Sequence, residues 1–406
     1  MESRARDPFR SVPAQRSQDR ARLTGAFAAF SIAEGAIWIA LLVYAYERGG
    51  VAEASALAIL LLAPSAVLAP AFGALASRSG PVLRRALGLQ AGLAAGVGAV
   101  LAGFGDGLWP YAGAALLCAS LSATRPIVST LLPVVSGPAP QLSRANAMIV
   151  LFEGVGDLAG PLLAALVLGA AGPAAVLYVA SVLLAVAAWT TRAAHVPDHS
   201  DAGITPAPSP LALTPDRWLL VTCLALPTLL FGAVELLAPA IGAEMLGVTG
   251  QVAGYLVAML GCGGVAGALL ARTVGTRSDL VRRHGVATLV SAAAFFGIGA
   301  SYDVWTTLFL LFLCGVANGY AWVVGMSLVQ RVATNAERGF LFGMLESGEA
   351  IGLALVTLGI AAVTVGLGVR GTFAIFGMCI ACIVLVSQLR LRGIGKLATL
   401  PSWAAR

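Results

Sequence analysis

Residues 73–85 read Gly-Ala-Leu-Ala-Ser-Arg-Ser-Gly-Pro-Val-Leu-Arg-Arg, and residues 267–283 read Gly-Ala-Leu-Leu-Ala-Arg-Thr-Val-Gly-Thr-Arg-Ser-Asp-Leu-Val-Arg-Arg. The two stretches begin 194 residues apart, and the same interval separates Arg144 from Arg338. Each stretch follows a long apolar run and ends in a pair of arginines. The pattern predicts a duplicated chain whose two halves have the same topology.

The composition around these stretches is strongly apolar. Of the 406 residues, 59% are hydrophobic and only 11% are charged, with a mean hydropathy of +0.90. Soluble domains have about 45–50% apolar and about 25% charged residues. A water-soluble fold of this length cannot hide so much apolar surface, so the sequence predicts an integral membrane protein.

Apolar runs of membrane-spanning length recur along the chain. A span needs about 20 apolar residues, and a backbone in lipid must satisfy its own hydrogen bonds, which favours helices. The runs that meet this length are residues 24–46, 54–76, 86–105, 109–133, 145–170, 172–192, 218–243, 250–272, 285–301, 304–328, 340–366 and 369–389. We therefore expect an all-α fold of twelve transmembrane helices in two pseudo-symmetric six-helix bundles.

One polar interior stretch separates the two halves. Residues 193–217 are rich in proline and polar residues, which is typical of a linker. The predicted organisation is given by five consecutive segments: tail 1–23, bundle 24–192, linker 193–217, bundle 218–390 and tail 391–406.

The basic residues are distributed unevenly over the two predicted faces. Of the 25 Lys and Arg residues, 22 fall on the side of the N-terminus, Arg48 and Arg370 fall on the other side, and Arg125 falls within a span. Cytoplasmic loops carry such an excess of positive charge, so both termini are predicted to be cytoplasmic. The net charge of +6 therefore reflects membrane topology and not binding of nucleic acid. The abundance of arginine over lysine suggests a GC-rich genome and hence a bacterial plasma (inner) membrane.

The stretch at 73–85 resembles the loop between helices 2 and 3 of the major facilitator superfamily, and the likeness extends over essentially the whole chain. The matching positions include Gly73, Arg78 and Gly80. The resemblance implies that this loop latches the cytoplasmic gate. Ser77 stands where the family usually has aspartate, which departs from the usual latch.

Two further motifs in the first half resemble the same family. Arg125 follows Leu121 in the manner of the family's helix-4 arginine motif, although the usual Gln and Gly do not follow. Gly156, Gly160 and Pro161 resemble the motif typical of the family's antiporters. Small residues four apart allow close helix approach in lipid, and proline permits a bend. The alternative is close packing without a gating role.

Ionisable residues within the expected spans are the candidates for proton coupling. They are Glu34, Arg125, Glu153 and Asp157. Charged residues in membrane spans are costly and usually face a pathway or one another. Burial favours the neutral form of a carboxylate and a nearby cation favours the charged form, so movement of Arg125 would change proton affinity. The alternative is a fixed structural pair between helices 4 and 5.

A second group of residues is assigned to a substrate cavity. In the family that the chain resembles, helices 1, 4, 7 and 10 line the central cavity, which points to Trp38, Glu235, Asn318 and Trp322. Aromatic side chains in a cavity suit amphipathic or cationic ligands. Aromatic residues in helices more often belong to the packing core, and this alternative remains open.

Chemistry other than transport has little support in the sequence. Cys379 and Cys382 form a C-x-x-C pair in an apolar run without a nearby base, and the three histidines are expected in polar loops, so no metal site, cofactor or catalytic residue is predicted. A phosphate-cradling G-x-x-x-x-G-K-[ST] loop is absent from the sequence.

These patterns predict a secondary active transporter that exports amphipathic small molecules in exchange for protons. We expect it to work as a monomer in the lipid bilayer. Two alternatives stay open: a proton-coupled importer of metabolites, and a non-transporting sensor or scaffold on the same fold. The glycine motif of the fifth span favours export, whereas Ser77 and the incomplete helix-4 motif favour the scaffold.

Overall fold

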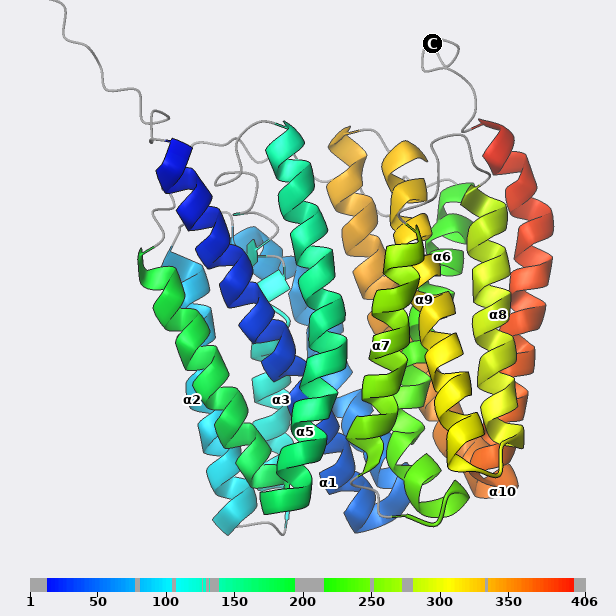
Figure 1. Cartoon of the computed structure of the whole chain (residues 1–406), viewed down its shortest axis with the longest axis horizontal. Helices are drawn as coiled ribbons and strands as arrows, with labels where there is room; N and C mark the ends of the chain where they lie inside the picture. The colour runs from blue at the N-terminus through cyan, green and yellow to red at the C-terminus, as the bar shows by residue number, and fades with distance from the viewer. Residues whose placement is uncertain are drawn as a thin grey trace, which may run out of the picture.

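The structure, a computed structural model, is an all-helical bundle over the residues it describes (Figure 1). These are residues 13–76, 81–103, 107–125, 127–128, 131, 139–193, 215–248, 252–271, 280–332 and 335–397. Within these ranges no residue forms a β-strand. The predicted all-α class is therefore confirmed.

Eight helices longer than 15 residues and several shorter ones make up the described part of the chain. In chain order they are α1 (Pro13–Ala76), α2 (Pro81–Gly103), α3 (Trp109–Leu121), α5 (Ala139–Thr190), the 3₁₀ helix η1 (Thr191–Ala193), α6 (Pro215–Ala240), the π-helix η3 (Ile241–Met245), α7 (Ala253–Ala271), α8 (Leu280–Ala300), α9 (Val304–Val332) and α10 (Asn335–Leu397).

The three longest helices are each divided by a glycine. Gly50 in α1, Gly172 in α5 and Gly368 in α10 have φ of 64°, 77° and 68°, which side chains with a Cβ rarely adopt. Each of these helices therefore consists of two helical segments joined at a non-helical residue.

Seven described helical stretches are long and apolar enough to cross a membrane. Their burial differs with position: the window in α6 and η3 is 78% buried, whereas the window in α10 is only 11% buried. The low burial of an apolar helix is the pattern of a lipid-facing surface. The prediction of a multi-pass membrane protein is confirmed.

The two halves of the chain lie side by side. In Figure 1, α1, α2, α3 and α5 lie on the left and α6 to α10 on the right. The start of α1 and the end of α10 lie at the same end of the bundle. Each side has aromatic core contacts, Phe27 with Phe30 in the first half and Phe295 with Phe373 in the second, with ring centroids 5.9 and 4.6 Å apart.

Glycine allows the helices of the second half to approach closely. A Cβ added to Gly267 of α7 would lie 2.8 Å from the backbone N of Tyr320, and one added to Gly319 of α9 would lie 2.9 Å from Cα of Gly264. In lipid such close backbone contact supplies packing that the hydrophobic effect cannot supply between spans.

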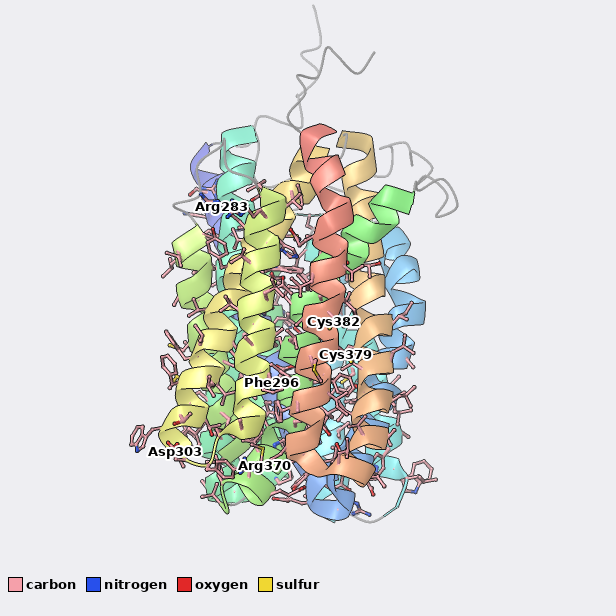
Figure 2. All side chains as sticks on the ribbon, turned by 90° about the vertical axis from the view of Figure 1, so that its right-hand side faces the viewer. Arg283, Phe296, Asp303, Arg370, Cys379 and Cys382 are labelled. Carbon is pink, nitrogen blue, oxygen red and sulfur yellow. The ribbon has the colours of Figure 1, made fainter. Side chains whose placement is uncertain are left out.

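Asp303 fixes the beginning of α9, at the end of the bundle opposite Arg283 (Figure 2). Its Oδ1 accepts a hydrogen bond of 2.8 Å from the backbone N–H of Thr306. This is an N-cap, which satisfies a donor that the first helical turn leaves free. Hydrogen bonds from the Thr306 side chain and from the Thr306 backbone hold the pKa of the exposed Asp303 carboxyl below its usual range.

The expectation that all histidines lie in polar loops is wrong for His284. This residue is buried in the first turn of α8, and its ring nitrogens lie 3.0 and 3.1 Å from the carbonyl oxygens of Ala321 and Cys223. It therefore joins α8 to α9 and α6. The helix begins before the apolar run from which its start was estimated. His195 and His199 lie outside the described residues.

Candidate functional site

A break after α3 places Arg125. The hydroxyls of Ser120 and Ser122 bond to carbonyl oxygens three residues back, at 2.6 and 2.8 Å, which competes with continuation of the helix. Gln90 of α2 donates to the Ser120 carbonyl and to Thr124 Oγ1, at 2.7 and 2.9 Å. The Ser120 carbonyl at the break therefore has a partner, and Thr124, next to Arg125, is bound to α2.

Arg125 lies between two carboxylates from different helices. Its Nη2 donates to Glu34 Oε2 of α1 at 2.9 Å, and its Nη1 donates to Glu153 Oε1 of α5 at 2.7 Å. The side chains of Arg125, Glu34 and Glu153 are 38, 28 and 25% exposed. We call these three residues the Arg125 cluster. It joins α1, α5 and the segment after α3, and its partial exposure leaves it accessible to water or to a ligand.

Asp157 lies one helical turn beyond Glu153 on α5, and its side chain is exposed. It is close enough to interact electrostatically with Arg125. The two hydrogen bonds described within the Arg125 cluster join Arg125 to Glu34 and to Glu153, and neither includes Asp157. Asp157 thus adds a third carboxylate beside one guanidinium without being tied to it.

Trp38 and Glu235 bring the second half of the chain to this region. Trp38 lies four residues after Glu34 on α1, and Glu235 of α6 lies close enough to interact with it. Trp38 Nε1 is nevertheless buried without a hydrogen-bond partner of good geometry in the described part of the chain. Trp38 therefore places its indole near the half-buried carboxylate of Glu235, which belongs to the second half of the chain.

The structure does not join the other two cavity candidates to this cluster. Asn318 and Trp322 lie on α9, both half-buried. Asn318 Oδ1 is buried and lacks a hydrogen-bond partner among the described residues. No described hydrogen bond or ion pair connects either residue with Arg125 or Glu235.

The glycine motif of α5 packs against α1. A Cβ added to Gly156 would lie 2.5 Å from Ser31 Cβ, and one added to Gly160 would lie 2.7 Å from the Ile32 carbonyl oxygen. From the α1 side, a Cβ on Gly35 would lie 3.3 Å from Cδ of Pro161. The motif therefore holds α1 and α5 together next to the Arg125 cluster.

The opposite face of the same α5 segment packs against α7. A Cβ added to Gly261 would lie 2.9 Å from Cα of Leu158, and one added to Gly254 would lie 2.7 Å from Ala165 Cβ. This segment of α5 thus contacts α1 in its own half and α7 in the other half.

Of the candidate gating residues in the stretch 73–85, the structure describes only Gly73. Gly73 lies within the helical span of α1, whereas Arg78 and Gly80 lie outside the described residues.

Cys379 and Cys382 are exposed on the outer face of α10 (Figure 2). No group of three or more metal-ligating side chains occurs in the ranges that the structure describes.

One contact between the halves was not anticipated from the sequence. The Tyr46 hydroxyl, near the kink of α1, donates to Glu244 Oε1 of η3 at 2.9 Å. The two residues are 198 positions apart. The only sequence signal was their location at the ends of apolar runs, and no local pattern pairs them.

Arg370 was assigned to the face with few basic residues, and the structure shows its contacts. Its guanidinium donates to the carbonyl oxygens of Gly299, Ser301 and Met245, with the first and last distances at 3.1 and 3.4 Å. It also lies 4.3 Å from the centroid of the Tyr302 ring. Arg370 therefore links the connection between α8 and α9 to the end of η3, at the end of the bundle opposite Arg283 (Figure 2).

The family model and the similar solved structures all describe transporters. A family model described as Major Facilitator Superfamily matches residues 23–306. Among solved structures, the POT family transporter PepTSo is similar with a TM-score of 0.72 and 12% identity, covering 93% of this chain and 98% of that one. A POT family transporter in complex with 5-aminolevulinic acid has a TM-score of 0.70 and 12% identity, covering 94% of this chain and 96% of that one. No curated protein matches the chain.

Proposed function

The chain belongs to the major facilitator superfamily of transporters, and from this premise we propose that it exports amphipathic small molecules in exchange for protons. The single observation that carries the proposal is Arg125 held between Glu34 and Glu153, at 2.9 and 2.7 Å, with all three side chains partly exposed. Carboxylates of this kind can take up protons, and a cation that binds them controls when they do so.

In the proposed cycle, protons and substrate compete for the same negative charge. When Arg125 pairs with both glutamates, as in the structure, its single positive charge is shared between two carboxylates. A rearrangement of α1 against α5 withdraws Arg125 from one glutamate, which then binds a proton. A cationic or amphipathic substrate is attracted to the excess carboxylates, Asp157 and Glu235 included, and protonation lowers that attraction.

The helix contacts provide a path for the rearrangement. The glycine motif of α5 lies against α1 and the other face of α5 lies against α7 of the second half. Interfaces between small residues can slide with little loss of side-chain packing. We propose that movement of one half against the other passes through this segment of α5 and reaches the Arg125 cluster directly.

The membrane arrangement that we propose has twelve spans, in bundles 24–192 and 218–390 joined by the linker 193–217, with both ends cytoplasmic in a bacterial inner membrane. The glycine kinks that divide α1, α5 and α10 support this number. The excess of basic residues on the side of the N-terminus supports the orientation.

The direct experiment uses purified protein in liposomes that contain a pH-reporting dye. A proton gradient is imposed, and ethidium, tetraphenylphosphonium, a neutral drug, a sugar and 5-aminolevulinic acid are added one at a time. We expect proton flux with the two lipophilic cations. Proton flux with none of the compounds, in protein shown to be folded, would contradict the proposal and favour the non-transporting scaffold.

A second candidate function is uptake of a small zwitterionic metabolite. The Arg125 cluster offers both signs of charge within one site, which suits a ligand carrying an amino and a carboxyl group. Proton flux evoked by 5-aminolevulinic acid and by neither lipophilic cation would establish this alternative.

The hydrogen bond between Tyr46 of α1 and Glu244 of η3 is expected to restrain the motion of η3. Tyr46→Phe removes one hydrogen bond between the halves, worth about 0.5–1.5 kcal/mol. Amide hydrogen exchange of residues 241–248 should therefore become about 2- to 10-fold faster. Tyr178→Phe, at an exposed tyrosine on α5, is the matched control and should leave this exchange unchanged. Equal exchange in the wild type and in Tyr46→Phe would contradict the restraint.

A further inference from the structure

A groove of about 660 Å³ lies on the periphery of the second half, between α7, α8 and α9. Its walls are mostly apolar: Val286 and Val290 of α8 and Leu270 of α7 line it and are 53, 38 and 54% exposed. The opposite wall is formed by α9 through Leu313 and Val316. In a membrane-spanning chain these exposed side chains face lipid.

One end of the groove is basic and polar. Arg282 and Arg283 lie in the first turn of α8 and line the groove together with Tyr320 of α9. Arg283 Nη1 donates to the Tyr320 hydroxyl at 3.2 Å, which spans the groove. Figure 2 shows Arg283 near the end of the bundle at which the described chain begins and ends. With α8 and α9 taken as membrane spans, this end lies at the membrane boundary on that side.

The polar and apolar parts are arranged along the membrane normal. From Arg283 to Val290 is seven residues, or about 10 Å at the rise of an α-helix. From Tyr320 to Leu313 on α9 is the same length in the opposite chain direction. Two positive charges therefore lie at the level of lipid head groups, and the apolar part of the groove extends about 10 Å from them along the helix axes.

We propose that this groove binds one anionic phospholipid from the leaflet on the side of the chain ends. The phosphate lies against Arg282 and Arg283, and one acyl chain lies between α8 and α9. A basic pocket between spans at the cytoplasmic boundary matches the charge of anionic head groups. A soluble anion gains nothing from the apolar walls, and a zwitterionic lipid brings no net charge to the two guanidinium groups. The site is independent of the direction of transport.

The test is native mass spectrometry of the full-length protein in detergent, with phosphatidylglycerol or phosphatidylcholine of identical acyl chains added. Each arginine near the head group contributes roughly a 5-fold preference for the anionic lipid, so two give about 25-fold. We expect Arg282→Gln combined with Arg283→Gln to abolish this preference. Equal retention of the two lipids by the wild-type protein would overturn the proposal.

A matched control separates the groove from general surface charge. Arg84→Gln combined with Arg85→Gln removes the same charge from exposed residues near the start of α2, the corresponding position in the first half. It should keep the preference for phosphatidylglycerol. An equal loss in both double variants would refute a specific site.

A second variant tests the acyl chain with both arginines in place. Val290→Phe fills the groove at a half-exposed position and should reduce retained phosphatidylglycerol several-fold. Inorganic phosphate at millimolar concentration should not displace the lipid. Full displacement by phosphate, or undiminished binding in Val290→Phe, would contradict occupation of the groove by an acyl chain.

Discussion

Arg125→Gln is expected to reduce coupled transport by about 10- to 100-fold. The variant leaves Glu34 and Glu153 without the guanidinium that they share, and the loss of a hydrogen bond to a charged group costs about 1.5–3 kcal/mol. The partial exposure of the cluster keeps the effect below that of a fully buried ion pair. The measurement is the initial rate of substrate-evoked proton flux in liposomes.

Two comparisons define what the loss at Arg125 means. Arg125→Lys keeps the charge but not the fork that reaches two carboxylates at once, so it should retain an intermediate rate. Arg192→Gln removes an exposed arginine that lies over Trp189 and should leave the rate within about 2-fold of wild type. A wild-type rate in Arg125→Gln would remove the cluster from the mechanism.

Gly160→Ala is expected to destabilise the protein by about 1–3 kcal/mol, because the added Cβ would lie 2.7 Å from the Ile32 carbonyl oxygen and 3.0 Å from Cα of Gly35. These contacts are backbone atoms, which cannot rotate away. The thermal midpoint in detergent should fall by about 2–6 °C. Transport should fall as well, since α1 and α5 carry Glu34 and Glu153 of the Arg125 cluster.

Gly169→Ala is the control on the same helix. A Cβ at Gly169 meets no atom within 4 Å, and alanine has the higher helix propensity. Its thermal midpoint should equal or exceed that of the wild type. Equal losses in Gly160→Ala and Gly169→Ala would show that the close approach of α1 and α5 contributes nothing to stability.

The membrane fold could be predicted from the sequence because its signals are local. A run of about 20 apolar residues is visible in a short window, and the repeat of residues 73–85 at 267–283 exposes the duplication without any tertiary contact. The start of α8 was estimated too late because its first turn contains Arg282, Arg283 and His284. These polar residues end an apolar run but not a helix.

The candidate site could be predicted only in part from such local signals in the sequence. The sequence identified Glu34, Arg125 and Glu153 as ionisable residues within expected spans, and the structure brings the three side chains together. The pairing of Tyr46 with Glu244 depends on how the two halves dock, which no local pattern records. Asn318 and Trp322 show the limit most clearly, because a helix that is apolar on all sides gives no indication of which face is inward.

The most direct test of proton coupling by the Arg125 cluster compares two modes of transport in Glu34→Gln. Exchange of labelled for unlabelled substrate needs alternating access but no net proton movement, whereas accumulation against a gradient needs both. The proposed mechanism predicts that Glu34→Gln keeps exchange within about 3-fold of wild type and loses accumulation driven by a proton gradient. Retention of both activities, or loss of both together in folded protein, would contradict it.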